Sequence, residues 1–286
     1  MVAPAAPDRL KSAPYVGDLR PATGYRGIER YSPRASAMIV RTDETLDVAV
    51  PGSGPMRTHL VRPAVAGRFP GVLLFSEIYQ VTAPIRRLAS VVAGHGYVVA
   101  IPEVYHEYEP AGVALAYDQS GTDRGNALKY TKTIAAYDAD ARAALAALAE
   151  HPDCTGRLAA MGVCLGGHLA FRAALNSSVS AAACFYPTDI HSGTLGAGKC
   201  DDSLARMGDL KAETLFVFGR QDPHVPFAGR ETIRARLEEA GARYEWHEVN
   251  AAHAFLRDEG PRYDPALFVQ AIGWVTALFA RALHGV

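Results

Sequence analysis

The stretch GRLAAMGVCLGGHLAFRAALNS, residues 156–177, joins an apolar strand to a helix through a very short turn that contains glycine. Cys164 stands at the junction, with Gly162 two residues before it and Gly166 two residues after it, in the pattern G-x-C-x-G. Small residues at these two positions allow a strained turn while the strand and the helix approach each other closely. The stretch therefore predicts a strand-to-helix turn that lifts the Cys164 sulfur into a cleft.

Outward from this turn, apolar strand patterns alternate with amphipathic helix patterns. The further strand patterns are FPGVLLFSE (69–77), YVVAIPEVY (97–105), SAAACFYP (180–187), ETLFVFGRQD (213–222) and RYEWHEVN (243–250). The helix patterns are residues 83–96, 131–152, 227–241 and 264–283. Such alternation is typical of a mostly parallel central sheet with helices on both faces. Residues 36–63 instead form two strands joined at Pro51–Pro55, which predicts an antiparallel N-terminal hairpin at one edge.

The remaining segments are predicted to be irregular. Residues 1–35 lack clear periodicity and are expected to form an arm, followed by one α/β domain over 36–286. Residues 106–125 are polar and contain glycine, which suggests a loop over a site. Residues 188–202 form a second, glycine-rich loop, followed by a short helix near 203–208.

Composition narrows the classes of partner. The 286 residues carry a net charge of −1, so nothing indicates binding to nucleic acid. No signal-peptide pattern begins the chain, and the apolar runs are interrupted by glycine or charge before 18 residues, so neither export nor a membrane partner is expected. The four cysteines form no C-x-x-C pair and no disulfide framework, which favours a reduced cytoplasmic protein without a structural metal. A small molecule remains as the expected partner.

Two further motifs supply an acid and a base. Asp222 follows the strand TLFVF in the segment GRQDPHVP, and His253 follows the last strand in AAHAF. The chain order nucleophile, acid, histidine is that of a Cys164–Asp222–His253 triad on this kind of sheet. Asp222 could instead cap the next turn or helix. His247 is a competing base, but it lies inside a strand pattern.

The segment after GVLLF completes the candidate site. Its backbone N–H at Ile78, together with that of Leu165 behind the nucleophile, is expected to form an oxyanion hole. Glu77 is unusual here, because a carboxylate directly after a buried strand is costly without a partner or a role. The alternative is a loop glutamate paired with an arginine.

The segments SEIYQ, GVCLGG, GRQDPHVP and AAHAF together resemble the dienelactone hydrolase family, over roughly residues 36–283. The resemblance implies an α/β-hydrolase fold and a cysteine nucleophile. It also implies that Glu77 switches partner when substrate binds and helps to deprotonate the thiol, with Arg257 as its ion-pair partner. The family binds a substrate carboxylate with an arginine before the long helix, for which Arg124 is the nearest candidate and Lys129 a possible substitute. A long N-terminal arm and an insertion around residues 191–200 depart from the family pattern.

The resulting prediction is a cysteine-dependent hydrolase of small lactones or esters that works through a thioester and needs no metal or organic cofactor. Two alternatives remain. One is a broader carboxylesterase or lactonase acting on neutral esters, and the other is a non-catalytic small-molecule binding protein of the same fold. The sequence leaves open whether the protein is a monomer or a homo-oligomer.

Overall fold

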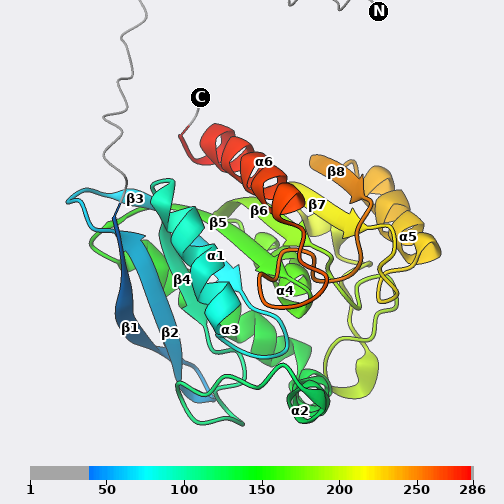
Figure 1. The fold of residues 1–286 in the computed structure, drawn as a ribbon, viewed down its shortest axis with the longest axis horizontal. Coiled ribbons are helices and arrows are strands. Elements are labelled where there is room, and N and C mark those ends of the chain that lie inside the picture. Colours follow the sequence, from blue (N-terminus) through cyan, green and yellow to red (C-terminus); the bar gives the residue numbers. More distant parts are fainter. Residues whose placement is uncertain (1–38, 285–286) are drawn as a thin grey trace, which may run out of the picture. The chain divides into compact units, whose positions relative to one another are not determined.

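A computed structural model describes residues 39–284, in which one mixed sheet of eight strands forms the centre (Figure 1). The strands are β1 (Val40–Val50), β2 (Gly54–Pro63), β3 (Phe69–Phe75), β4 (Val98–Pro102), β5 (Cys154–Val163), β6 (Val179–Phe185), β7 (Glu213–Gly219) and β8 (Tyr244–Val249). They lie in the order β1-β2-β4-β3-β5-β6-β7-β8. The first two strands pair antiparallel, as does β2 with β4, and all other pairs are parallel. The predicted parallel sheet and its N-terminal hairpin are confirmed, whereas the arm expected over residues 1–35 lies outside the described residues.

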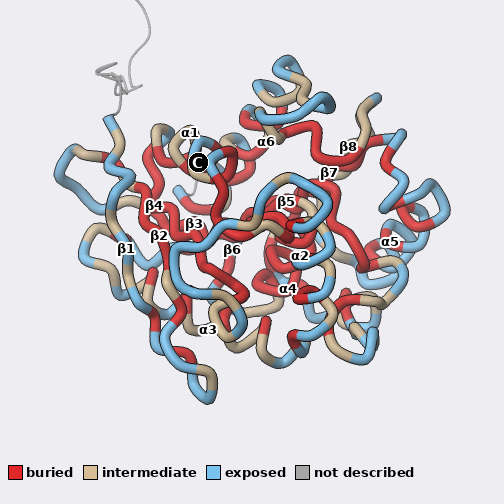
Figure 2. Tube along the Cα trace, turned by 60° about the horizontal axis from the view of Figure 1, so that its bottom comes forward, coloured by how far each residue is buried: buried red, intermediate tan, exposed pale blue. Residues whose placement is uncertain are grey.

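Helices cover both faces of this sheet. They are α1 (Ala83–Gly94), α2 (Gln119–Thr131), α3 (Ile134–Glu150), α4 (Leu165–Ala174), α5 (Phe227–Glu239) and α6 (Pro265–His284), with short 3-10 turns at Ala197–Lys199 and Met207–Asp209. Figure 2 shows the resulting contrast between the buried central strands and the exposed outer surfaces of the helices.

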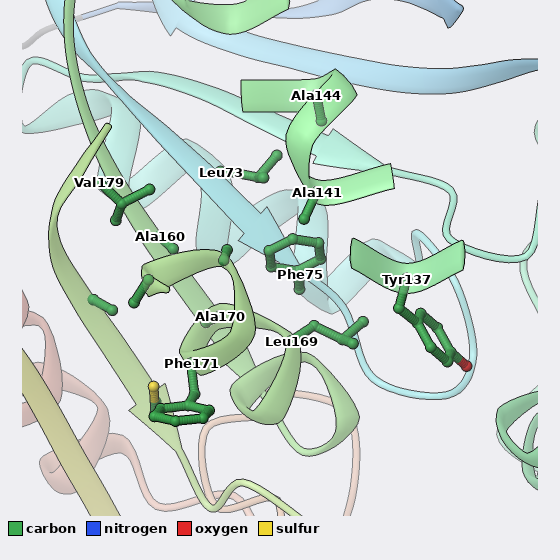
Figure 3. Packing of buried hydrophobic residues seen from close by; sticks show 14 of the residues in the cluster. Leu73, Phe75, Tyr137, Ala141, Ala144, Ala160, Leu169, Ala170, Phe171 and Val179 are labelled. Atoms are coloured by element: carbon green, nitrogen blue, oxygen red, sulfur yellow. The ribbon is translucent and has the colours of Figure 1, made fainter. Parts of the chain in front are cut away.

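Successive strand residues point to opposite faces, and this alternation divides the core in two. Val72 and Leu74 of β3 belong to the apolar cluster beneath α1 and α6. Leu73 and Phe75 belong to the cluster on the other face, where Tyr137, Ala141 and Ala144 of α3 and Leu169 of α4 cover them (Figure 3). Because both faces of β3 are covered, its continuous apolar run is the pattern expected of a central parallel strand.

The segment 106–125, expected to be a loop, contains the beginning of helix α2. The Asp118 side chain caps this helix by accepting the Gly121 N–H at 2.8 Å. A side chain at Gly121 could not fit, because its Cβ would lie 2.0 Å from the Ala116 carbonyl oxygen. The sequence of α2 is polar and contains two glycines, so it has no apolar periodicity by which it could be recognised.

Helix α6 also corrects an expectation. By length and composition it is the one helix among residues 39–284 that could cross a membrane, and Gly273 does not interrupt it. In the structure Val275, Leu278, Phe279 and Leu283 are buried against the sheet. These residues form the face of α6 that packs on β6 and β7, and 33% of its apolar window is buried.

Candidate active site

Cys164 occupies the tip of the turn between β5 and α4, with φ 58° and ψ −123°. A residue other than glycine adopts positive φ at a cost, and such strain is common where a side chain is presented for chemistry. A Cβ at Gly162 would lie 1.9 Å from the Gly166 carbonyl oxygen, and one at Gly166 would lie 2.2 Å from that of Phe75. Both glycines are therefore required by the close approach of α4 to the sheet, as the sequence predicts.

Asp222 and His253 come together from the ends of β7 and β8. The His253 Nδ1 lies 2.7 Å from Asp222 Oδ2, and the backbone N–H of His224 donates to Asp222 Oδ1 at 2.8 Å. Because a carboxylate only accepts, His253 carries its proton on Nδ1 and leaves Nε2 for another partner. The competing His247 is bonded to Glu245 at 2.7 Å and stacks on Trp274, so it does not enter this site.

The electrostatics of this trio favour a cationic histidine. Burial disfavours the charge of His253, but the charge of Cys164 and hydrogen bonds to Asp222 and Cys164 raise its pKa to about 10. Burial likewise opposes the charge of Asp222, yet its bonds to His253 and to the His224 N–H lower its pKa. An imidazolium beside the sulfur is the kind of neighbour that stabilises a nucleophilic thiolate.

Glu77 lies buried directly after β3, with two partners. Tyr117 donates its hydroxyl to Glu77 Oε2 at 3.0 Å, and Arg257 Nη1 lies 3.8 Å from the same oxygen. The Arg257 guanidinium also lies over the Tyr117 ring, 4.3 Å from its centroid. Burial raises the pKa of Glu77, while Arg257 and Tyr117 counteract part of that effect. Glu77 and Arg257 are thus placed together as the family resemblance implies, and Tyr117 is an additional partner.

A cavity of about 510 Å³ joins these residues. Cys164, His253, Glu77, Ile78 and Arg257 all line it. Leu165 is fully buried at the start of α4, so of this residue only the backbone can serve the site. The rest of the wall consists of Tyr79, Thr122, Asn126, Lys129, Tyr130, Thr188, Asp189, His191, Ser192, His224, Ala254 and Arg262, of which Lys129 is the residue that the sequence offered in place of Arg124.

Arg124 does not line this cavity, contrary to its expected role in binding substrate. Its Nε donates to Glu109 Oε1 at 2.5 Å, and about half of its side chain is exposed. Five residues along an α-helix turn the side chain by roughly 140°, so Arg124 and Lys129 face different directions. The cavity face of α2 instead carries Thr122, Asn126 and Lys129, at the spacing of one helix face.

Sequence reasoning also missed many polar residues of the wall, among them Asp189, His224 and Arg262. Asp189 lies in the loop after β6, where it pairs with Lys129 at 3.0 Å. The ring of His224 lies against that of His253, with centroids 4.6 Å apart. Arg262 follows the predicted histidine segment and has no ion pair among residues 39–284. Position after a strand could have indicated Asp189, but no spacing rule places Arg262.

One cluster of possible metal ligands lies away from the cavity. His106, Glu107 and Asp140 approach one another closely enough to hold an ion, but the Lys132 ammonium contacts both carboxylates, with Asp140 at 2.8 Å. None of these residues lines the active cavity. The lysine charge offsets one of the two carboxylate charges and joins both carboxylates in an ion-pair group.

Comparisons with known proteins show the family to which this chain is similar. The model of the dienelactone hydrolase family matches residues 56–283. A carboxymethylenebutenolidase homologue from Saccharomyces cerevisiae is 42% identical over 254 residues, which cover 85% of this chain and 93% of the relative. The carboxymethylenebutenolidase of Pseudomonas sp. strain P51 is 29% identical over 225 residues, covering 78% and 88% of the two chains.

Solved structures show the same fold. The crystal structure of a dienelactone hydrolase homologue from Klebsiella pneumoniae has a TM-score of 0.71 and 25% identity, covering 86% of this chain and 99% of the other. A dienelactone hydrolase-like promiscuous phosphotriesterase from metagenomic libraries has a TM-score of 0.67 at 21% identity, over the same shares of both chains. The α/β-hydrolase fold expected from the sequence is therefore confirmed.

Proposed function

The chain belongs to the dienelactone hydrolase family and is a hydrolase of ester bonds, and from this premise we propose that Cys164 is its nucleophile. The proposed substrates are small lactones and esters with a good leaving group, and the proposed intermediate is a thioester. The observation that supports this most directly is the placement of Cys164 at the strained tip of its turn, in one cavity with His253 and Glu77.

In the proposed reaction, Glu77 or His253 takes the thiol proton of Cys164, and the thiolate attacks the carbonyl carbon. The backbone N–H groups of Ile78 and Leu165 stabilise the tetrahedral oxyanion. The C–O bond then breaks, His253 donates its proton to the departing enolate or alkoxide, and a thioester remains. His253, oriented by Asp222, next takes a proton from water, and the resulting attack releases the acid and restores the cysteine.

Hydrolysis of an enol lactone and an aryl ester tests this proposal. We expect turnover to be lost in Cys164→Ala and unchanged in Cys200→Ser, because Cys200 is exposed and lies outside the cavity. In His253→Gln, mass spectrometry of the protein should detect the acyl group on Cys164, since deacylation is slowed. Full activity of Cys164→Ala would exclude Cys164 as the nucleophile. A complete absence of turnover by the wild type would favour a non-catalytic binding protein.

The placement of Arg124 supports a second candidate, a broader carboxylesterase or lactonase that acts on neutral esters. With Arg124 paired outside the cavity, Arg262 is the lining arginine without an ion pair among residues 39–284. We therefore compare an anionic lactone with its methyl ester in Arg262→Ala and in the control Arg124→Ala. A rise of KM for the anionic substrate alone in Arg262→Ala supports anion recognition, and equal kinetics for both substrates in all three proteins supports the neutral-ester activity.

The chemistry requires a reduced thiol, so we also propose that the protein works in a reducing compartment such as the cytoplasm. Cys164 is partly exposed in the cavity and is therefore open to oxidation. Fractionation of the source cells with an antibody against the protein tests the location. Recovery from an oxidising compartment would contradict it.

A further inference from the structure

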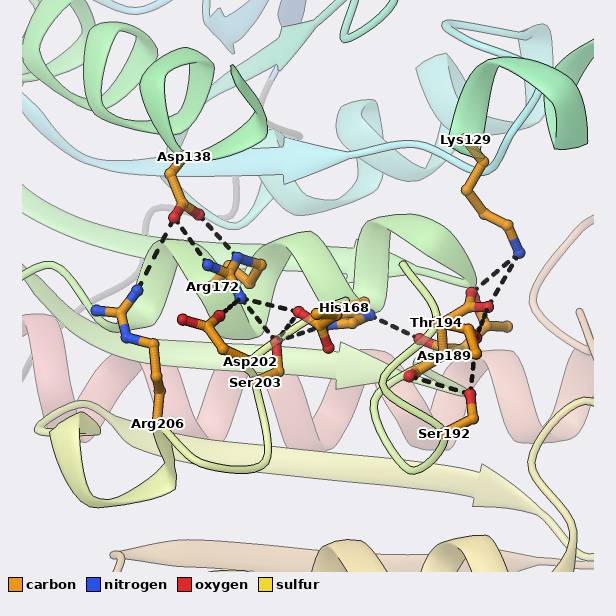
Figure 4. A network of polar contacts seen from close by, with 12 residues as sticks. Lys129, Asp138, His168, Arg172, Asp189, Ser192, Thr194, Asp202, Ser203 and Arg206 are labelled. Atoms are coloured by element: carbon orange, nitrogen blue, oxygen red, sulfur yellow. Dashed lines mark hydrogen bonds and ion pairs between the residues drawn. The ribbon is translucent and has the colours of Figure 1, made fainter. Parts of the chain in front are cut away.

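The wall of the active cavity contains a second buried ion pair besides Glu77 and Arg257. Lys129 reaches from α2 to Asp189, with its Nζ 3.0 and 3.2 Å from the two carboxylate oxygens (Figure 4). Each residue is 7% exposed, and each lines the same cavity as Cys164. None of the proposed chemical steps uses this pair, so its burial at the site is unexplained by the reaction alone.

Asp189 is held in a conformation that depends on its neighbours. Its φ is 67°, which is uncommon for a residue other than glycine. The Thr194 hydroxyl donates to Asp189 Oδ1 at 3.0 Å, and the Tyr130 hydroxyl donates at 3.4 Å. A carboxylate fixed in this way keeps a set position at the cavity wall before any ligand binds.

The loop that carries Asp189 is itself anchored beneath the site. Nδ1 of His168 in α4 donates to the Thr188 carbonyl at 2.8 Å, and its Nε2 lies 2.7 Å from Ser203 Oγ. Arg172, one turn further along α4, donates to Ser203 Oγ at 2.9 Å and to Asp138 of α3 at 2.8 Å (Figure 4). A network of buried polar contacts therefore holds the loop that carries Asp189 of the Lys129–Asp189 pair.

The charges of the pair cancel, and this determines what it can bind. Burial opposes both charges, but Asp189 raises the pKa of Lys129 and Lys129 lowers the pKa of Asp189, so both remain ionised. A ligand carboxylate at this wall would be repelled by the like charge of Asp189, and a ligand ammonium would be repelled by that of Lys129. A hydroxyl group meets neither difficulty, because it can accept from the ammonium and donate to the carboxylate.

We propose that the Lys129–Asp189 pair is a specificity-determining subsite that binds a hydroxyl group of the substrate. The inference rests on the proposed hydrolysis at Cys164 and names the class of substrate as hydroxylated lactones or esters. Asn126, Tyr130 and Ser192 extend the same wall with further donors and acceptors. Small-molecule sites are usually lined mainly by apolar side chains, so this wall is unusually suited to a polar ligand.

The expected discrimination is large. A site built to hydrogen-bond a substrate hydroxyl rejects the analogue that lacks it, because the buried polar groups of the site then lose a partner. Glucono-δ-lactone and δ-valerolactone share a six-membered lactone ring and differ in their hydroxyl substituents. We expect the wild type to have at least a tenfold higher kcat/KM for the hydroxylated ring, measured by acid release with the spontaneous rate subtracted.

The test variant is Lys129→Met combined with Asp189→Asn. Both charges are removed together, since an unpaired buried charge would destabilise the protein. The ratio of the two kcat/KM values does not depend on the fraction of active protein, so partial misfolding cannot change it. We expect the ratio to fall about tenfold or more. The matched control is Arg124→Met with Glu109→Gln, which removes an ion pair from the same helix outside the cavity and should leave the ratio unchanged.

Turnover of an aryl ester separates failure of this inference from failure of the proposed function. Wild-type enzyme that hydrolyses the aryl ester but shows no preference for the hydroxylated lactone, in turnover or as a competing ligand, overturns the subsite. An unchanged ratio in the double variant overturns it as well. Loss of all ester hydrolysis by the wild type, or full activity of Cys164→Ala, overturns the proposed function instead.

Discussion

The charge of Glu77 depends on opposing effects on its pKa, and the hydroxyl group of one neighbour is among them. Burial raises the pKa of Glu77, and the Tyr117 hydroxyl opposes that shift by donating to Oε2 at 3.0 Å. In the proposed reaction the ionised carboxylate assists removal of the Cys164 proton. Activity should therefore fall as the pH decreases through the pKa of Glu77, at a pH above the ordinary value of about 4.5.

The variant Tyr117→Phe should move this acid limb to higher pH. Removing a donor to the carboxylate disfavours the ionised form, so the pKa rises further. A hydrogen bond to a charged group is stronger than one between neutral groups, so we expect the acid limb to move clearly to higher pH. The measurement is kcat/KM for an aryl ester between pH 4 and 8. The phenyl ring preserves the contact with the Arg257 guanidinium.

Tyr79→Phe is the matched control for this experiment. Its ring lies 4.7 Å from that of Tyr117, but its hydroxyl bonds Thr122 rather than Glu77. We expect the control to keep the acid limb of the wild type. If the acid limb moves equally in both variants, its shift does not depend on the hydrogen bond from Tyr117 to Glu77. An acid limb that persists unchanged in Glu77→Gln would show that another group controls the charge state.

The contact between α4 and the sheet places the strictest packing demand on an element of the site. A Cβ at Gly166 would overlap the Phe75 carbonyl oxygen at 2.2 Å, and the atom it would meet is backbone that cannot rotate away. Gly166→Ala should therefore destabilise the protein by about 3 kcal/mol, near the upper end for an overpacked position. Urea unfolding followed by circular dichroism measures this change, and ester turnover should decline with it because Cys164 shifts.

Gly273→Ala provides the opposite result in the same assay. Gly273 lies on the exposed side of α6, and a Cβ there would meet no atom within 4 Å. Alanine has a higher helix propensity than glycine, so we expect stabilisation by about 1 kcal/mol. Equal stability of the wild type and Gly166→Ala would show that α4 can move away from β3, contrary to the packing argument.

Sequence patterns predicted the helices and strands whose hydrophobic periodicity is strong. The strands β3, β5, β6 and β7 are short apolar runs bounded by polar turns, and each formed as expected. Helix α2 was missed because it begins at the Asp118 cap and turns a polar face to the cavity, so its sequence has no apolar period. The wrong expectation for Arg124 follows from this. Once the segment is known to be a helix, the direction of each side chain can be worked out, whereas a predicted loop gives no such information.

The order of the motifs along the chain predicted the location of the site better than any single motif did. Residues that follow parallel strands meet at one edge of the sheet, and this rule brings Cys164, His253 and Glu77 to one cavity, with Asp222 bonded to His253 behind it. It cannot predict which side chains pair across that cavity. The bonds of Lys129 to Asp189 and of Tyr117 to Glu77 join segments 60 and 40 residues apart, and local pattern contains no information on such distances.

The buried network under the 188–203 loop should contribute to the global stability of the fold. Asp201 is fully buried at its side chain and accepts from Arg172 at 2.9 Å and from Ser203 at 2.8 Å. Burial opposes its charge, but its bonds to His168 and Ser203 and the charge of Arg172 lower its pKa below 3.8. A lowered pKa in the folded state contributes stability that is present above the unfolded value of about 3.8 and is lost as the pH falls below it.

Asp201→Asn should therefore reduce the free energy of unfolding at pH 7 by about 3 kcal/mol, because Arg172 loses a buried partner. Its unfolding free energy should also depend less steeply on pH below about 4, where the wild type loses the stability that the ionised Asp201 contributes. Asp202→Asn is the control, since Asp202 bonds the same Nη1 of Arg172 at 2.7 Å with about half of its side chain exposed. An exposed pair contributes at most about 1 kcal/mol. Equal losses in the two variants, measured by urea unfolding across pH, would place the stabilising role in Arg172 itself rather than in the buried carboxylate.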